Sequence, residues 1–407
     1  MITVIDSPCG RGKTHSMITM INENPTKNYI YITPFLDEVE RIKNNTKFAY
    51  DKLPRFVSPS YKNHKKKYDS LVEYIYDAKD IVSTHSLFSR CTKDLINIIK
   101  QNKYTLILDE VMDVVRVLDI SKEDIGMLIK YGIAEVNENS ELIWKEPNYK
   151  YTDRFGDIMD LCKNNHVYVF NNIALVWTFP IEIFTAFQDV YICTYMFDCQ
   201  IQKYYYDLFN VPYTKKSIVN NEIVDYIEQK DNVDKIHIID NDKLNSIGID
   251  RYSLSKSWYK NNENKLKFVK NKIYNLVNNV MPLYLNTKIS YKDIIWTTFK
   301  NYKSKLSGKG YTKSFLPCNI RSTNDYCDRY IVIYMINVFL HPILIKFFRD
   351  KGVEIDQDKY ALAEMIQFIY RSSIRNNKDI YVYIPSFRMR NLLNKYIGPR
   401  ICYDRGF

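Results

Sequence analysis

The chain has 407 residues, which is enough for two domains of ordinary size, and its 46% hydrophobic content can bury real cores. The N-terminus lacks the basic and apolar regions of a signal peptide, and no run of about 18 uncharged apolar residues predicts a membrane span. The eight cysteines show no paired zinc-ligand spacing, which suits free thiols in the reducing cytoplasm. A net charge of +11 favours a polyanionic partner such as nucleic acid, although a general enrichment in lysine would produce the same sign.

Short apolar runs rich in β-branched and aromatic residues alternate with helical patterns in the first half of the chain. The predicted strands are 2–6, 28–33, 80–84, 104–110 and 189–195. The predicted helices are 13–23, 37–45 and 121–132. Strands that alternate with helices predict a parallel sheet covered by helices on both faces.

A second series of the same kind occupies the second half of the chain. Its predicted strands are 234–240, 293–299, 314–319, 329–335 and 379–385. Its predicted helices are 264–280, 357–377 and 385–396. The longest apolar run, 330–348, is interrupted by His341, Pro342 and Lys346, so it indicates a buried strand that leads into a helix. We place the domain boundary near 198–225, with domains 1–200 and 201–407.

Residues 7–14 read SPCGRGKT and fit the phosphate-loop pattern G-x-x-x-x-G-K-[ST], except that serine replaces the first glycine. Glycines permit the turns that point backbone N–H groups at an anion, and the following helix adds its positive N-terminal dipole. Lys13 is expected to reach the β- and γ-phosphates of ATP, and the Thr14 hydroxyl to bind Mg²⁺. The predicted nucleotide-binding residues are Ser7, Pro8, Cys9, Gly10, Arg11, Gly12, Lys13 and Thr14. A strand before the loop and a helix after it argue against an ordinary glycine turn.

The segment LILDEV at 106–111 supplies two carboxylates directly after an apolar strand. Asp109 and Glu110 should therefore lie at the carboxyl end of that strand, near the phosphate loop. An aspartate in this position can hold Mg²⁺, and a glutamate beside it can orient or deprotonate the attacking water. The alternative is a solvated turn that merely begins with two acidic residues.

These two motifs resemble those of superfamily 2 helicases of the DEAD/DEAH type, in the compact form found in phage genomes. SPCGRGKT is similar to motif I and LDEV to motif II, while YITPF at 31–35 resembles motif Ia and STHSLF at 83–88 resembles motif Ib. ICTYMF at 192–197 stands at the place of motif III. The resemblance implies an α/β fold of two tandem RecA-like domains, with ATP and Mg²⁺ in the cleft between them.

The resemblance also implies contacts with nucleic-acid phosphates in the first domain. The matching positions are Thr33 in motif Ia, and Thr84 with His85 in motif Ib. The last two residues fit a helix N-cap beside a packed histidine equally well.

Three segments of the second half are similar to the later motifs or lie between them. IIWTTF at 294–299 resembles motif IV, and CNIRSTNDY at 318–326 resembles motif V. The glycine-punctuated basic loop 307–315 between them either contacts the strand or is a plain exposed hairpin. The nucleic-acid contacts expected in this half are Lys309, Lys313, Arg321 and Thr323.

QFIYRSSIR at 367–375 resembles motif VI, whose usual form is Gln-x-x-Gly-Arg-x-x-Arg. Gln367, Arg371 and Arg375 are spaced by four residues, so a continuous helix would place all three on one face. One arginine can then stabilise the developing phosphoryl charge as a finger. The middle glycine is absent and an extra residue separates the arginines, so the identity of the finger stays open. A basic, solvated helix face is the alternative interpretation.

The motifs together predict an ATP-dependent helicase or translocase that acts on DNA, or on RNA, in phage replication or recombination. A monomer or weak oligomer is expected, without membrane association and loaded by another replication protein. A packaging-type ATPase is the second interpretation, but the C-terminal segment holds few carboxylates for the nuclease that such ATPases usually carry. A nucleotide-dependent binding module without unwinding activity is the third.

Overall fold

The computed structural model describes residues 1–46, 54–61, 64, 66–145, 152–164, 166–318 and 325–398. The chain divides into two compact units. The larger unit comprises Met1–Ser7, Arg11–Glu228 and Leu340–Ile355. The smaller unit comprises Pro8–Gly10, Gln229–Phe339 and the chain from Asp356 onward.

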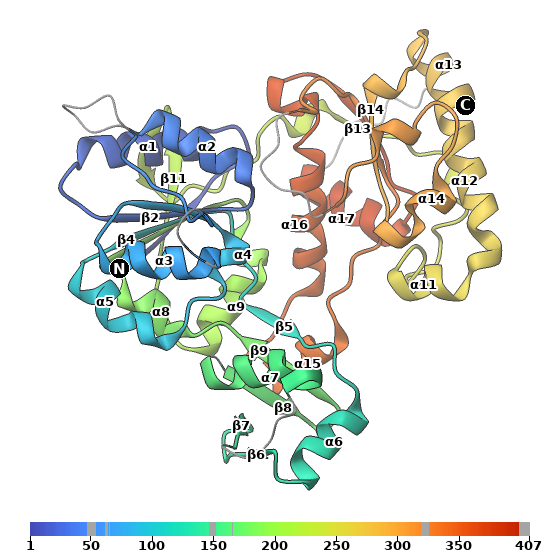
Figure 1. The fold of residues 1–407 in the computed structure, drawn as a ribbon. Helices are drawn as coiled ribbons and strands as arrows, with labels where there is room; N and C mark the ends of the chain where they lie inside the picture. Colours follow the sequence, from blue (N-terminus) through green and yellow to red (C-terminus); the bar gives the residue numbers. More distant parts are fainter. Residues whose placement is uncertain are drawn as a thin grey trace. The chain divides into compact units, whose positions relative to one another are not determined.

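The larger unit is built on a seven-stranded sheet of order β12-β11-β1-β10-β4-β2-β3. Figure 1 labels β2, β4 and β11 of this sheet. All neighbouring pairs are parallel except β11 with β12. The strands are β1 (Ile2–Asp6), β2 (Tyr29–Thr33), β3 (Ile81–Thr84), β4 (Thr105–Asp109), β10 (Asp189–Thr194), β11 (Thr214–Val219) and β12 (Glu222–Asp225). The first five coincide with the predicted strands to within one residue at each end, which confirms the parallel sheet of the first half.

Helices cover both faces of this sheet, and its central strands β2 and β4 are buried along their whole length. In β2, Tyr29 and Tyr31 pack into one apolar cluster with α1 and α2, whereas Ile30 and Ile32 pack into the cluster on the opposite face. The helices of the sheet layers are α1 (Lys13–Glu23), α2 (Leu36–Asn45), α3 (Lys67–Tyr76), α4 (His85–Phe88), α5 (Ile96–Gln101), α8 (Ile181–Ala186) and α9 (Ile201–Leu208).

A small antiparallel layer is inserted between β4 and β10. Its sheet has the order β5-β9-β8, and β6 pairs with β7 beside it. Its elements are β5 (Val115–Val117), α6 (Lys122–Lys130), β6 (Ala134–Val136), β7 (Leu142–Trp144), α7 (Thr152–Asn164), β8 (His166–Phe170) and β9 (Ala174–Thr178). Helix α15 (Pro342–Asp350) comes from much later in the chain, yet it packs on β5 and β9 and buries Phe347 and Phe348 in the same core.

The smaller unit contains a four-stranded, fully parallel sheet of order β13-β16-β15-β14. The strands are β13 (Ile236–Ile238), β14 (Ile294–Thr297), β15 (Ile331–Tyr334) and β16 (Ile380–Tyr383). The helices are α10 (Asp242–Asn245), α11 (Lys256–Asn261), α12 (Leu266–Asn275), α13 (Met281–Leu285), α14 (Lys303–Leu306), α16 (Gln357–Ile369) and α17 (Phe387–Ile397). A π-helical segment, Leu276–Val280, joins α12 to α13. Two parallel α/β units in tandem confirm the fold class expected from the motifs.

Three sequence-based boundaries need correction. The domain boundary at 200/201 falls inside the larger unit, because β11 pairs with β1 and extends its sheet. The strand expected at 314–319 is replaced by a 3-10 turn at Thr312–Ser314 and one isolated bridge from Phe315 to Trp296. Pro317 cannot donate a ladder hydrogen bond there.

The helix expected over 357–377 is also shorter than predicted. Helix α16 ends at Ile369, and the Ser372 hydroxyl donates to the Ile369 carbonyl oxygen at 2.7 Å. Such local side-chain bonds to the backbone compete with continuation of a helix. Arg375 lies on a separate 3-10 segment, Ser373–Asn376, so Arg371 and Arg375 do not share a helix face with Gln367.

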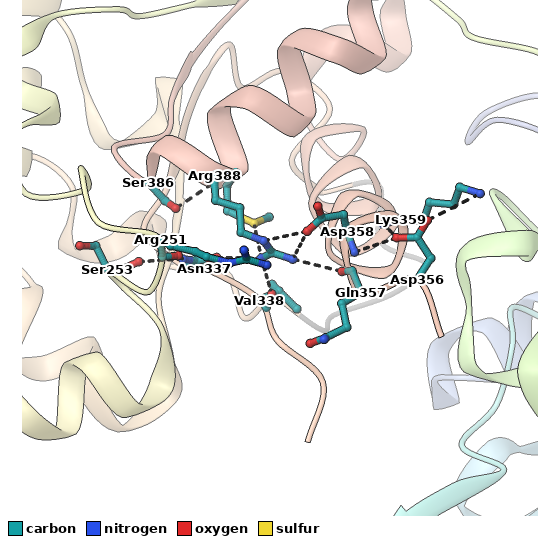
Figure 2. A network of polar contacts seen from close by, with 11 residues as sticks. Arg251, Ser253, Asn337, Val338, Asp356, Gln357, Asp358, Lys359, Ser386 and Arg388 are labelled. Atoms are coloured by element: carbon teal, nitrogen blue, oxygen red, sulfur yellow. Dashed lines mark hydrogen bonds and ion pairs between the residues drawn. The ribbon is translucent and has the colours of Figure 1, made fainter. Parts of the chain in front are cut away.

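Arg388 organises the region of the smaller unit where the chain leaves it at Phe339 and returns at Asp356 (Figure 2). Its guanidinium donates to Asp358 Oδ1 at 2.9 Å, to Asn337 Oδ1 at 2.9 Å and to the Val338 carbonyl at 2.8 Å. Asn337 in turn donates to the carbonyls of Arg251 and Ser253. Arg388 lies on α17, which corresponds to the helix predicted over 385–396.

No helix in the described part of the chain combines the length and the apolar composition that a bilayer crossing needs.

Candidate nucleotide site

The phosphate loop and the acidic pair come directly after neighbouring strands of the larger sheet. Strand β10 lies between β1 and β4, with Asp6 opposite Thr194 and Asp109 opposite Cys193. The ladder extends past the strand ends, because the Ser7 amide donates to the Thr194 carbonyl at 3.0 Å and the Glu110 amide donates to the Cys193 carbonyl at 2.8 Å. Parallel strands bring their carboxyl ends to one edge of the sheet, so the two motifs emerge at the same edge.

The loop has the backbone that an anion cradle requires. Gly10 and Gly12 have φ of +93° and +83°, a region that favours glycine. Helix α1 begins at Lys13, and the Ser16 amide closes its first turn on the Gly12 carbonyl at 2.8 Å. Lys13 is buried, and its Nζ donates to the Ser7 carbonyl at 2.6 Å, so the ammonium is held within the loop.

Ser7, which departs from the usual glycine, has a structural partner. Its hydroxyl accepts a hydrogen bond from the Ile218 amide of β11 at 2.8 Å, and the residue is fully buried. The serine therefore ties the start of the phosphate loop to the next strand of the sheet.

Thr14 and Asp109 form the oxygen pair expected of a Mg²⁺ site. The Thr14 hydroxyl lies 3.5 and 3.4 Å from the two carboxylate oxygens of Asp109. Burial raises the pKa of Asp109 to about 7, and the neighbouring charges of Glu110 and Glu38 add to the increase. A hydroxyl and a buried carboxylate are hard oxygen donors, and a carboxylate crowded by other carboxylates favours a cationic partner, so these residues fit Mg²⁺.

Glu110 directly follows β4, at the same edge of the larger sheet, and its backbone conformation is constrained. Its φ is +76°, which is uncommon for a residue with a side chain. The Thr194 hydroxyl donates to its Oε2 at 3.0 Å, and Gln200 Nε2 donates to the Thr194 hydroxyl at 2.9 Å. A chain of three polar side chains therefore orients the carboxylate expected to act on water and connects it to the segment that resembles motif III.

Sequence reasoning did not assign roles to Asp6, Gln200 and Asn221. The Asp6 carboxylate accepts from the Met196 and Phe197 amides at 2.7 and 3.0 Å, which joins the end of β1 to the turn after β10. An aspartate that ends a strand directly before a phosphate loop was the available signal for this role.

The β11–β12 hairpin places its turn against the phosphate loop. Asn220 and Asn221 both have positive φ, which is typical of a two-residue hairpin turn. Asn221 accepts a hydrogen bond from the Ser16 hydroxyl on its carbonyl at 3.1 Å. A Cβ atom at Gly12 would lie 2.8 Å from Asn221 Oδ1, so a side chain there would displace the Asn221 amide, and the positive φ favours glycine. The Asn-Asn pair between two runs of alternating polar and apolar residues was the sequence signal for this hairpin turn.

The expected nucleic-acid residues of the larger unit lie at the same sheet edge. Thr33 at the end of β2 is opposite Thr84 at the end of β3, and His85 begins α4. Thr33 is fully buried, whereas Thr84 and His85 are partly exposed. The arrangement therefore favours Thr84 and His85 over the Thr33 side chain as contacts for a strand.

The expected residues of the smaller unit have different surroundings. Gln367 and Arg371 are buried, at 8% and 5% exposure, and Arg375 is partly exposed. Lys309 and Lys313 are exposed, and Lys313 Nζ lies 5.6 Å from the centre of the Tyr291 ring. Arg321 and Thr323 fall outside the described residues. The roles of all these residues in binding and catalysis stay predictions.

The fold defines the chain as an α/β protein with two parallel-sheet units. A family model for the YonV C-terminal Rossmann-like domain matches residues 230–397, and one for the YonV middle domain matches residues 115–177. The chain is 42% identical over 415 residues to the SPbeta prophage-derived protein YonV of Bacillus subtilis (strain 168), covering 97% of this chain and 98% of that protein. The chain therefore belongs to the YonV family.

Solved structures to which this chain is similar include two XPD proteins. An XPD helicase is 10% identical with a TM-score of 0.45, covering 97% of this chain and 94% of that one. Xpd4 of S. tokodaii is 13% identical with a TM-score of 0.46, covering 96% of this chain and 92% of that one. The DUF1998 helicase MrfA bound to DNA is 9% identical with a TM-score of 0.32, and the match spans 98% of this chain but 46% of that protein.

Proposed function

We propose that this chain is an ATP-dependent helicase or translocase of nucleic acid. The observation that carries the proposal is the convergence of Lys13, Thr14, Asp109 and Glu110 at one edge of the larger sheet. A buried lysine inside a glycine loop, a hydroxyl beside a carboxylate and a second, oriented carboxylate are the parts that phosphoryl transfer to water requires.

Each residue has a distinct role in this proposal. Lys13 and the loop amides bind the phosphates, and Thr14 with Asp109 would hold Mg²⁺. The bound Mg²⁺-ATP supplies the phosphoanhydride bond and a cation that offsets charge on the phosphates. Glu110, held by Thr194, accepts a proton from the attacking water. Gln367, Arg371 and Arg375 are the candidates for transition-state contacts from the smaller unit.

The proposal extends to nucleic acid because the chain has a second parallel α/β unit and a net positive charge. DNA is favoured over RNA because the YonV relative is prophage-derived, which supports a role in phage replication or recombination. A packaging-type ATPase would use the same phosphate loop, and a nucleotide-dependent binding module would lack turnover.

The test is phosphate release from ATP by the full chain, with and without single-stranded and duplex DNA or RNA. A helicase or translocase shows turnover that nucleic acid stimulates. The matched variant Glu110→Gln keeps the size and hydrogen-bonding capacity of the side chain but removes the base. We expect it to bind ATP and retain nucleic acid tightly while turnover falls by about 10²–10⁴-fold. Wild-type protein that binds nucleic acid but releases no phosphate would identify a binding module instead.

A further inference from the structure

The positive charge of this protein is concentrated in one segment of the smaller unit. The whole chain has 58 basic and 47 acidic residues. Residues 256–313 contain 13 lysines, no arginine and only two acidic residues, which leaves 45 basic and 45 acidic residues elsewhere. The net charge of +11 of the whole protein therefore equals the net charge of this segment. A general enrichment in lysine does not explain why this segment has so few acidic residues.

Both acidic residues of the segment are already engaged. Glu263 Oε1 pairs with Lys305 Nζ at 2.8 Å, and Asp293 Oδ2 accepts the Ser290 amide in a capping box at 2.7 Å. Eleven of the thirteen lysines are exposed, and Lys270 and Lys272 are partly exposed. Among the described residues, the pair with Glu263 is the single ion pair that this segment makes. The segment thus carries a large positive charge that its own carboxylates do not balance.

Helix α12 and the glycine-punctuated loop after α14 bring part of this charge onto one surface. The helix buries Leu266, Val269 and Ile273, and the face beside them carries Lys267, Lys270, Tyr274 and, in the π-helical continuation, Asn278. Asn278 Nδ2 donates to the Lys309 carbonyl at 3.2 Å, and Gly310 packs against the same asparagine. We call the surface of Lys267, Lys270, Tyr274, Asn278 and Lys309 the α12 stripe.

We propose that the α12 stripe binds the phosphate backbone of a single nucleic-acid strand. The inference rests on the proposed function for the identity of the polyanion as nucleic acid. From Lys267 to Asn278 the helix rises about 16 Å at 1.5 Å per residue. One strand of a duplex presents about five phosphates over that length at 3.4 Å each. The exposed Tyr274 ring, at 42% exposure, adds a surface for base stacking between the lysines.

An anionic membrane is a poorer occupant of this surface. A helix that lies on a bilayer inserts its apolar face, but Leu266, Val269 and Ile273 of α12 are buried in the core of the smaller unit, which leaves Phe268 and Tyr274 as the exposed large apolar side chains of the helix. The α12 stripe consists of charged, amide and aromatic groups, which suits phosphates and bases.

The test is fluorescence anisotropy of a labelled single-stranded oligonucleotide with the full chain, measured over a series of salt concentrations without ATP. The variant Lys267→Gln/Lys270→Gln/Lys309→Gln removes three charges from the stripe. Lys100→Gln/Lys122→Gln/Lys130→Gln removes three charges from exposed positions of the larger unit and is the matched control. The slope of log K against log salt should decrease in magnitude by about two for the stripe variant, at about 0.7 for each phosphate contact, and stay unchanged for the control.

Two further measurements make the outcome decisive. The triple Lys→Arg variant preserves the charge and should preserve the slope, and melting curves verify that each variant is folded. A stripe variant that matches the control in slope and affinity overturns the proposal. The proposal is equally overturned if the stripe variant loses binding only to vesicles of anionic lipid and keeps its affinity for the oligonucleotide.

The failure of this proposal can be separated from failure of the proposed function. ATP turnover by the wild-type chain reports on the nucleotide site alone. An absence of turnover, together with a reduced slope for the stripe variant, would support the nucleic-acid surface and contradict the proposed ATP-dependent activity. Turnover that nucleic acid stimulates, together with an unchanged slope for the stripe variant, would support the proposed function and show that the strand binds to another surface.

Discussion

The two units of this protein share a parallel α/β architecture but differ in the residues at the carboxyl ends of their strands. In the larger unit, β1 and β4 end in Asp6 and Asp109, and they are followed by the glycine-containing loop 7–14 and by the second carboxylate, Glu110. In the smaller unit, β14 ends in Thr297 and β16 is succeeded by Ile384 and Pro385. The smaller unit instead carries the lysine-rich segment between β13 and β14 and beyond.

This difference shows that two units with the same fold need not carry the same kinds of functional residue. The larger unit has the polar side chains to which we assign phosphoryl transfer, and hydrogen bonds hold them at a sheet edge. The smaller unit has an excess of unbalanced lysines on its helices and loops. Binding of the nucleotide and activation of water are thus expected to depend on individual residues in the larger unit, and strand binding on summed charge in the smaller one.

Among the variants that test this difference between the units, Lys13→Ala should have the largest effect on ATP turnover. The variant removes the buried ammonium of the phosphate loop, and turnover should fall by at least about 10²–10³-fold because a preorganised positive charge is lost. Phosphate release with saturating ATP is the measurement, and Lys100→Ala at an exposed position is the control. Normal turnover by the variant would mean that the phosphate loop is assigned to the wrong residues.

The second prediction asks whether the smaller unit contributes a catalytic residue at all. If Arg371 or Arg375 is a finger, alanine at that position should lower turnover by about 10³-fold and leave ATP binding nearly intact. Lysine should rescue poorly, because an ammonium cannot reproduce the planar fork of a guanidinium. We favour Arg375 as the finger. The readouts are turnover, ATP affinity and melting temperature, with exposed Arg349→Ala as the control.

The outcome of that experiment decides how sharply the two units differ. Full stimulated turnover in both alanine variants would confine catalysis to the larger unit and contradict a helicase mechanism.

A third prediction concerns the stability of the larger sheet. Arg55 donates to Asp80 Oδ2 at 2.6 Å and to the carbonyls of Ile21 and Lys27 at 2.7 Å, with 1% and 9% exposure of the two paired side chains. Arg55→Ala should lower the free energy of unfolding by about 3–5 kcal/mol, because it leaves a buried carboxylate without its cation. Urea denaturation measures the loss, and exposed Arg90→Ala should stay within about 0.5 kcal/mol of the wild type.

The loss of stability in Arg55→Ala should depend on pH. Burial raises the pKa of Asp80 above its ordinary value of 3.8, and Arg55 opposes that increase. Without Arg55 the pKa rises further, so the folded state binds the proton more tightly than the unfolded state. The deficit should be smallest in acid, where the carboxyl is protonated in both states, and should grow as pH rises above 3.8 through the folded pKa. A deficit that is equal at acid and neutral pH would contradict this account.

The smallest effect is expected at the hairpin beside the phosphate loop. Asn221→Gly keeps the positive φ of the turn but removes the side chain that lies against Gly12. We expect the ATP affinity to fall by less than tenfold, corresponding to about 1 kcal/mol for one hydrogen-bonding group. Asn220→Gly, at the neighbouring turn position, should leave the affinity unchanged. Equal behaviour of the two variants would show that Asn221 serves the turn alone.

Much of the fold could be predicted because its signals are local. The five strands of the first half and helix α1 are encoded in apolar runs and helical spacing, and the phosphate loop in its glycines. The shared helix face predicted for motif VI was wrong, because spacing of four residues indicates a helix face only while the helix lasts, and α16 ends at Ile369. The role of Thr194 in orienting Glu110 depends on a strand pairing that links residues 84 positions apart.

By itself the sequence determined the α/β class, the place of the phosphate loop and the acidic pair, since each arises from neighbouring residues. It also indicated that the apolar run 330–348 is a strand leading into a helix, which β15 and α15 confirm. The tertiary structure alone decided that these two elements separate, with β15 in the sheet of the smaller unit and α15 on β5 and β9 of the larger one. The physical reason is that apolar periodicity specifies that a face must be buried, whereas the partner that buries it is selected by packing between segments far apart in the chain.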